Sequence, residues 1–167
     1  MKRVRVAVVG VGHLGKEHAR ILAGLPEVEL VGVADVNYDQ AQQVARRLGT
    51  QAFQDSWPLL NLVDAASIVV PSTYHLAVAR EFLKRGISLL IEKPLALTVA
   101  QSQELVDLAE EHGALLQVGH IERFNPAFEE LTRRPIRPSF VEAERHGPFT
   151  GRSLEDDEDE TMREEKQ

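Results

Sequence analysis

A chain of 167 residues can build one domain with a hydrophobic core and a short remainder, but it is too short for two complete domains. Aromatic residues make up 5% of the sequence and the formal charge is −7, which argues against a stacking surface or a basic face for nucleic acid. No apolar run approaches the length of a membrane span, and the absence of cysteine excludes disulfides and thiolate metal sites, so we expect a cytoplasmic protein without a bound metal.

The first predicted elements are a strand, a glycine-rich turn and a helix between residues 4 and 20. The β-branched strand residues suit a strand covered on both faces, and Gly10, Gly12 and Gly15 follow at the spacing G-x-G-x-x-G. In this spacing the first glycine permits a tight turn, the second lets the backbone approach a diphosphate, and the third lets the helix pack close to the strand. The helix N-terminus then faces the phosphates, so the pattern predicts a dinucleotide site rather than a bare connecting turn.

The second predicted strand covers Val28 to Ala34 and is followed by Asp35, twenty residues after Gly15. A carboxylate at this position can accept hydrogen bonds from the ribose hydroxyls of adenosine and would repel a 2′-phosphate. The sequence therefore favours NAD over NADP. Because acidic residues are also common in turns, a purely structural role for Asp35 stays open.

Apolar runs alternate with helical periodicity through the rest of the chain, which is typical of βαβ units and a parallel sheet. We expect further strands at residues 51–53, 65–70, 87–91 and 115–118, and helices at 38–48, 57–62, 74–85 and 98–112. Glycines are placed to end three of these helices. Six strands with right-handed crossovers give an α/β fold with a doubly wound parallel sheet of the Rossmann type, whose ligand crevice lies at the carboxyl ends of the strands.

Two polar clusters follow predicted strand ends and are candidates for contact with a bound dinucleotide or its substrate. In residues 71–75, hydroxyls and backbone can line a cofactor, while a capping or packing role for His75 is an equal alternative. In residues 119–126, His120, Arg123 and Asn125 are candidates for substrate contact. The alternatives there are an interdomain ion pair for Arg123 and a helix cap for Asn125.

A third cluster, Glu92-Lys93-Pro94, is more specific. A hydrophobic strand that ends in an adjacent acid and base directs the lysine away from the sheet edge, and the proline restricts its backbone. An ammonium group held there can hydrogen-bond a substrate hydroxyl and stabilise the alkoxide character that develops during hydride transfer. The alternative is a solvated pair of charges on a loop.

At these clusters the sequence resembles the N-terminal domain of the Gfo/Idh/MocA oxidoreductases, the glucose–fructose oxidoreductase and inositol dehydrogenase family. The matching segments are GVGHLGKEHAR, the strand end at Asp35, VVPSTYH, IEKPLALT and VGHIERFNPAF, within about residues 1–150. The resemblance implies Lys93 as the catalytic lysine, and it implies these cofactor-binding residues: Gly10, Gly12, His13, Leu14, Gly15, Asp35, Pro71, Ser72, His75, Glu92 and Lys93. It also implies hydride transfer between NAD and a sugar or nucleotide-sugar hydroxyl. GHIERFNP is most similar to members that oxidise nucleotide sugars such as UDP-N-acetylglucosamine at C3.

Members of this family continue into a second α/β domain that covers the nicotinamide and supplies a histidine partner for the lysine. Here a strand expected at Ser139–His146 would open such a sheet, but residues 151–167 hold eight acids and three bases. We therefore expect a Rossmann domain at 1–135, a remnant of the second domain at 136–150 and a disordered acidic tail at 151–167. This change of composition is interpreted as a truncated or frameshifted reading frame.

Two functions of different classes follow. The first is an NAD-dependent oxidoreductase that needs the missing domain from another chain. The second is a catalytically inactive dinucleotide-binding module. In both cases the unpaired edge of the strand at 139–146 would favour a homo-oligomer or a partner chain.

Overall fold

The computed structural model describes residues 2–133, 139, 140, 142 and 144. The chain forms two compact units, Met1–Asn125 and Pro126–Gln167. The first unit contains the sheet and the candidate site, and the described part of the second begins with helix α5 (Pro126–Arg133). The expected acidic tail lies outside the described residues, as does half of the expected strand at Ser139–His146, so both stay predictions.

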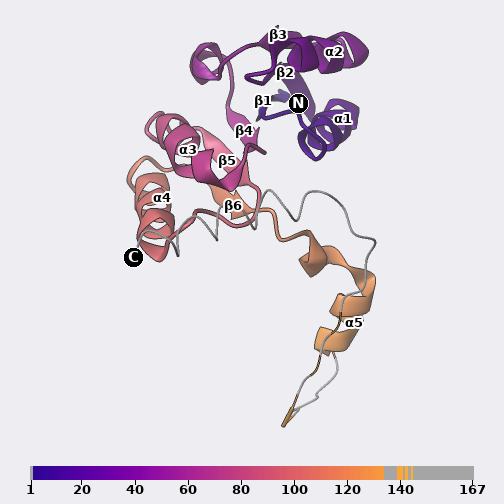
Figure 1. Cartoon of the computed structure of the whole chain (residues 1–167), viewed down its shortest axis with the longest axis vertical. Helices are drawn as coiled ribbons and strands as arrows, with labels where there is room; N and C mark the ends of the chain where they lie inside the picture. Colours follow the sequence, from indigo (N-terminus) through magenta and orange to yellow (C-terminus); the bar gives the residue numbers. More distant parts are fainter. Residues whose placement is uncertain (1, 134–138, 141, 143, 145–167) are drawn as a thin grey trace, which may run out of the picture. The chain divides into compact units, whose positions relative to one another are not determined.

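The first unit is built on a six-stranded sheet with the order β3-β2-β1-β4-β5-β6 (Figure 1). All neighbouring strands are parallel. The strands are β1 (Val4–Val9), β2 (Val28–Ala34), β3 (Gln51–Phe53), β4 (Ala65–Ile68), β5 (Ser88–Ile91) and β6 (Leu116–Val118). This strand order is that of a doubly wound Rossmann sheet, which confirms the predicted fold class.

Helices cover the sheet in two groups (Figure 1). Helices α1 (Gly15–Gly24) and α2 (Tyr38–Leu48) lie beside β1, β2 and β3, whereas α3 (His75–Leu83) and α4 (Val99–Glu111) lie beside β4, β5 and β6. Three short 3-10 helices complete the connections: η1 (Trp57–Asn61), η2 (Ser72–Tyr74) and η3 (Ile121–Phe124). Within the described residues, none of the helices has the length and apolar character needed to span a membrane.

Local capping groups set both ends of α2 and the start of α4. The Asn37 side chain accepts a hydrogen bond from the Gln40 amide at 3.3 Å and begins α2, while Gly49, with a φ of 69°, ends it in the left-handed conformation. The Thr98 hydroxyl accepts a hydrogen bond from the Gln101 amide at 3.2 Å and begins α4. Both helices therefore have the bounds that their capping residues indicate.

The sheet buries apolar side chains on both faces. Val8 and Val33 belong to a cluster with residues of α1 and α2. Ala7 and Ala34, which adjoin them in sequence, belong to a second cluster that includes Phe82 of α3. This alternation follows from the two-residue period of a strand, and it places the sheet between two helical layers.

The region after β4 differs from the expectation. Strand β4 ends at Ile68 rather than Val70, because β1 ends at Val9 and leaves the following residues without a partner on that side. The next helix is also divided into η2 and α3, and α3 begins at His75, one residue later than expected. These residues form a loop at the carboxyl edge of the sheet.

An ion pair joins β1 and β4 at the amino-terminal edge of the sheet. Arg5 donates hydrogen bonds to the Asp64 carboxylate through Nη2 at 2.7 Å, through Nε at 3.1 Å and through its main-chain amide at 3.0 Å. The guanidinium and then the amide of Arg5 hold the pKa of Asp64 at about 2, below its usual 3.8. The two side chains are 41% and 40% exposed, so solvent screening limits the pair to less than about 1 kcal/mol of stability.

We expect Asp64→Asn to lower the free energy of unfolding at neutral pH by at most about 1 kcal/mol. Because the folded-state pKa of Asp64 lies below its unfolded value, the pair stabilises the fold fully above about pH 5, and this contribution is lost as the pH falls towards 2. In urea unfolding followed by circular dichroism, the difference between wild type and variant should therefore shrink between about pH 5 and pH 3.

The control for this experiment is Glu111→Gln, which alters an exposed acid on α4 that has no arginine partner among the described residues. Its effect on unfolding should vary little over the same pH range. A difference between wild type and Asp64→Asn that stays constant as the pH falls would contradict the assigned role of the pair.

Candidate functional site

The carboxyl edge of the sheet gathers most of the candidate residues. The glycine turn follows β1, Asp35 follows β2, the loop with His75 follows β4, and Lys93 follows β5. Strands β1 and β5 both pair with β4, so two strand spacings, about 10 Å, separate the ends of β1 and β5. We call the segment Glu92-Lys93-Pro94, which follows β5, the lysine loop. The glycine turn and the lysine loop therefore lie on one edge of the sheet, as a shared ligand crevice requires.

Two of the three glycines in the turn are required by the fold itself. Gly10 has a φ of 85°, and a Cβ there would stand 2.5 Å from the carbonyl oxygen of Val69. A Cβ on Gly15 would collide with the carbonyl oxygen of Gly10. Side chains at either position would force the turn away from β4 or from the start of α1.

Gly12 is different because the free protein has room for a side chain there. Its nearest neighbour beyond the turn is Nε2 of Gln40, 4.0 Å from where a Cβ would lie. Among the described residues the structure gives no hydrogen-bond acceptor to the amides of residues 12–15, and no side chain caps α1. Unpaired amides at a helix N-terminus beside an open glycine fit a diphosphate, so this turn meets the requirements of a dinucleotide.

Asp35 has structural partners that the sequence alone did not reveal. Its Oδ2 accepts hydrogen bonds from the Val11 amide at 2.8 Å and from Nε2 of Gln40 at 3.3 Å, while its Oδ1 accepts one from the Asn37 amide at 2.9 Å. The carboxylate therefore holds the glycine turn against the start of α2. A carboxylate can accept about four hydrogen bonds, which leaves capacity for a ribose hydroxyl.

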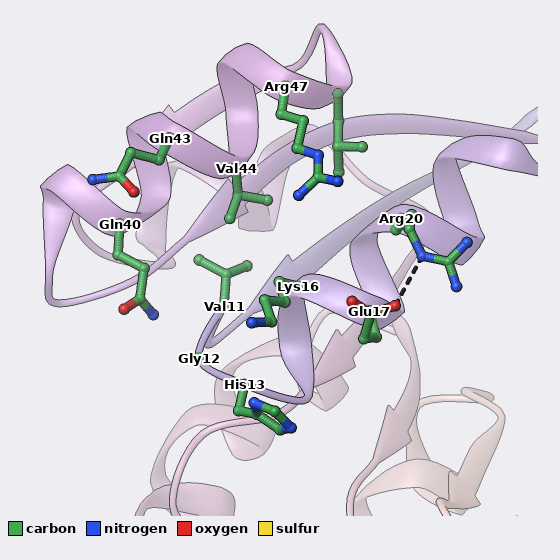
Figure 2. Close-up of a pocket in the computed structure, with 11 residues that line it drawn as sticks. Val11, Gly12, His13, Lys16, Glu17, Arg20, Gln40, Gln43, Val44 and Arg47 are labelled. Atoms are coloured by element: carbon green, nitrogen blue, oxygen red, sulfur yellow. Dashed lines mark hydrogen bonds and ion pairs between the residues drawn. The ribbon is translucent and has the colours of Figure 1, made fainter.

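A groove of about 490 Å³ opens between α1 and α2 beside the glycine turn (Figure 2). The lining residues are Val11, Gly12, His13, Lys16, Glu17, Arg20, Gln40, Gln43, Val44, Arg47 and Leu48. The groove meets the turn at Gly12 and at Gln40, the partner of Asp35, so it adjoins the predicted adenosine end of the site. It does not extend to Lys93.

The charged residues that line this groove are mainly basic. Lys16 and Arg20 come from α1, and Arg47 extends from α2 towards them (Figure 2). Glu17 pairs with Arg20 at 2.8 Å, and this hydrogen bond lowers the pKa of the Glu17 carboxyl, with smaller effects from Lys16 and Arg47. The positive charge exceeds the negative, which suits the neighbourhood of a phosphate-bearing ligand.

The lysine loop presents an exposed cation next to a nearly buried acid. The Glu92 side chain is 12% exposed, and its Oε2 accepts a hydrogen bond from the Lys93 amide at 3.2 Å. The Lys93 side chain is exposed, and no carboxylate among the described residues pairs with its ammonium group. The Lys93–Pro94 peptide is cis. The two charged groups thus have different surroundings, and the ammonium group is accessible to a ligand.

His75 connects the lysine loop to the end of β4. The ring is buried, with Nδ1 2.8 Å from the carbonyl oxygen of Pro94 and Nε2 2.9 Å from that of Val70. Both ring nitrogens thus have main-chain partners, which supports the packing alternative for this residue, and its contact with a cofactor stays a prediction. Pro71 and Ser72 lie just before it, at the start of η2.

The cluster after β6 makes mostly local contacts. The Asn125 amide group donates a hydrogen bond to the Glu122 carboxylate at 2.9 Å, and the Arg123 amide bonds to the His120 carbonyl at 3.1 Å. His120, Arg123 and Asn125 are all exposed. Within the described part of the chain, the structure gives no hydrogen bond between Lys93 and the side chains of His120 or Arg123, so the role of this cluster in substrate binding stays a prediction.

One polar residue at this edge was missed by the sequence analysis. The His18 ring, on α1, lies 2.9 Å from Oγ of Ser67 and 3.2 Å from Oε1 of Glu92. Ser67, only 2% exposed, is the one polar residue in strand β4. The sequence signal for this contact was a serine in an otherwise apolar strand, because a buried hydroxyl needs a hydrogen-bond partner.

Two known proteins have sequences similar to that of this chain. UDP-N-acetylglucosamine 3-dehydrogenase from Acidithiobacillus ferrooxidans is 41% identical over 158 residues, which cover 94% of this chain and 50% of that protein. The scyllo-inositol 2-dehydrogenase (NAD(+)) from Bacillus subtilis is 35% identical over 136 residues, covering 79% of this chain and 40% of that protein. The chain thus spans about half the length of the curated relatives it matches.

Solved structures agree with this relationship. The A. ferrooxidans enzyme matches with a TM-score of 0.75 over 80% of this chain and 43% of that chain, at 41% identity. The scyllo-inositol dehydrogenase from Lactobacillus casei with bound NAD(H) and scyllo-inositol matches with a TM-score of 0.74 over 79% of this chain and 40% of that chain, at 26% identity. The family described as "Oxidoreductase family, NAD-binding Rossmann fold" matches residues 4–120. The chain therefore belongs to the Gfo/Idh/MocA oxidoreductase family and carries its NAD-binding Rossmann fold.

Proposed function

We propose that this chain is the cofactor-binding half of an oxidoreductase that transfers a hydride between NAD and a hydroxyl of a sugar or nucleotide sugar. The observation that carries this proposal is the position of the glycine turn and the accessible Lys93 ammonium on one edge of the sheet, with only β4 between their strands. The amides of residues 12–15 would bind the diphosphate, and Asp35 would bind the adenosine ribose.

Lys93 would act on the substrate hydroxyl. Oxidation of a carbinol transfers a hydride from carbon to bound NAD and releases a proton from oxygen. The ammonium form of Lys93 cannot accept that proton, so the proton would pass to solvent water at the exposed side of the site. A hydrogen bond from the Lys93 ammonium to the reacting oxygen stabilises the negative charge that develops there. Its lack of a carboxylate partner among the described residues favours this role over a solvated charge pair.

Four further features belong to the proposal: the choice of cofactor, the substrate class, the location and a partner chain. NAD is favoured over NADP because the Asp35 carboxylate would repel a 2′-phosphate. The first of the relatives above acts on a nucleotide sugar, as its name states, and its 41% identity makes this substrate class the first to test. A cytoplasmic location fits the absence of cysteine, and a second copy or partner chain would pair with the strand that the sequence predicts at 139–146.

Gly12→Ala tests the cofactor site without disturbing the fold. The free protein has room for the methyl group, so the thermal unfolding temperature should stay the same or rise slightly. The methyl group would occupy the position that a diphosphate must approach, so NADH affinity should fall by roughly tenfold or more in a fluorescence titration.

The matched control is Gly24→Ala at the end of α1, where a Cβ has no neighbour within 4 Å. Its NADH affinity should equal that of the wild type. If Gly12→Ala also bound NADH as tightly as the wild type, the diphosphate would not lie on this turn.

Turnover separates the oxidoreductase from the inactive binding module. If the chain is half of an oxidoreductase and another chain supplies the second domain, incubation with NAD and a panel of sugars and nucleotide sugars should form NADH in the presence of one substrate class. Lys93→Ala should reduce that rate by about a hundredfold or more, because it removes the group that stabilises the reacting oxygen. Lys84→Ala, which removes an exposed lysine at the end of α3, should leave the rate unchanged. Binding of NADH without turnover on any substrate would favour the inactive module.

A further inference from the structure

Three polar side chains lie in contact at the carboxyl edge of the sheet: Ser67 on β4, His18 on α1 and Glu92 after β5. The imidazole Nδ1 lies 2.9 Å from the Ser67 hydroxyl, and Nε2 lies 3.2 Å from Oε1 of Glu92. The side chains of His18 and Glu92 are 19% and 12% exposed, and Ser67 is 2% exposed. These contacts join the helix that begins at the glycine turn to the loop that carries the lysine.

Glu92 is confined from the other side by Gly119. A Cβ at this glycine would stand 2.7 Å from Oε1 of Glu92, so any other residue at this position would displace the carboxylate. The backbone of Gly119 is fixed in turn, because its amide donates to the Ile91 carbonyl at 2.7 Å. The Glu92 carboxylate therefore lies between the His18 ring and the turn after β6.

A carboxylate that is largely removed from water needs hydrogen-bond donors. Oε2 of Glu92 accepts a hydrogen bond from the Lys93 amide, and Nε2 of the His18 ring faces Oε1 at 3.2 Å. The Ser67 hydroxyl can donate to Nδ1 of His18, which leaves the ring proton on Nε2, the nitrogen that faces Glu92. Ser67 thus orients the ring, and the ring orients the acid.

We propose that His18 is a positioning residue that holds the Glu92 carboxylate in place for the nicotinamide half of the cofactor. This inference rests on the proposed function, in which Lys93, the neighbour of Glu92, acts on the substrate hydroxyl at the end of the site where the nicotinamide would lie. It deepens that function because it assigns the orientation of Glu92 to a histidine on α1. The glycine turn and the lysine loop are then coupled through one side chain.

The test compares two ligands that differ at the nicotinamide end. NADH carries the nicotinamide, whereas ADP-ribose keeps the adenosine and diphosphate but lacks it. We expect His18→Leu to weaken NADH binding by about tenfold and to change ADP-ribose binding by less than about twofold, in calorimetric titrations. His18→Gln should recover part of the NADH affinity, because its amide N–H group can still donate to Glu92.

Two further variants complete the experiment. Gly119→Ala displaces Glu92 from the opposite side, so it should show the same selective loss of NADH binding. His112→Leu, which removes a histidine at the end of α4, should change neither affinity. In the His18→Leu/Glu92→Gln double variant the loss should be no larger than for either single change, as expected for residues that act through one another.

The outcomes are distinct. If His18→Leu weakened both ligands equally, or neither, the residue would only pack α1 and the inference would be overturned. If the wild-type chain bound neither NADH nor ADP-ribose, the proposed function itself would fail. Selective loss of NADH binding, with partial recovery in His18→Gln, is the result that supports the positioning role.

Discussion

The close contact between the glycine turn and the end of β4 is the constraint on which the rest of the site depends. The main chain at Gly10 lies so near Val69 that a Cβ would stand 2.5 Å from its carbonyl oxygen. This contact aligns the start of α1 over the middle of the sheet, next to the end of β5. From that position the first turns of α1 present unpaired amides at one end and His18 at the other, within 3.2 Å of Glu92.

The glycines of the turn show how fold and function can be separated. Gly10 and Gly15 are needed by the folded chain, since side chains there would meet the main chain. Gly12 has no such neighbour, so the free protein gives no reason for a glycine at that position. A ligand that approaches the backbone does give one, and this is why we attribute Gly12 to the cofactor and not to the fold. Asp35 combines both roles, because it holds the turn and retains hydrogen-bonding capacity.

Much of the fold could be predicted from the sequence because its signals are local. Strand β2, helix α2 and its end at Gly49 follow from β-branched runs, a capping asparagine and a left-handed glycine. The early end of β4 was not predictable, because it depends on where β1 stops in space. The contact of His18 with Ser67 was missed for the same reason, since 49 residues separate the two in sequence. The buried partners of His75 also arise only when the lysine loop packs against β4.

The site as described is open on its reactive side. Lys93 is exposed to solvent, whereas hydride transfer is favoured where water is excluded. Because the chain is about half as long as the relatives it matches, its binding of the cofactor and its turnover have to be measured separately.

The most direct measurement of the central claim is a crystal structure of this chain with NAD. The account predicts the diphosphate on the amides of residues 12–15 and the nicotinamide beside Glu92 and Lys93. A cofactor lying along the groove between α1 and α2, with its nicotinamide away from Lys93, would contradict it.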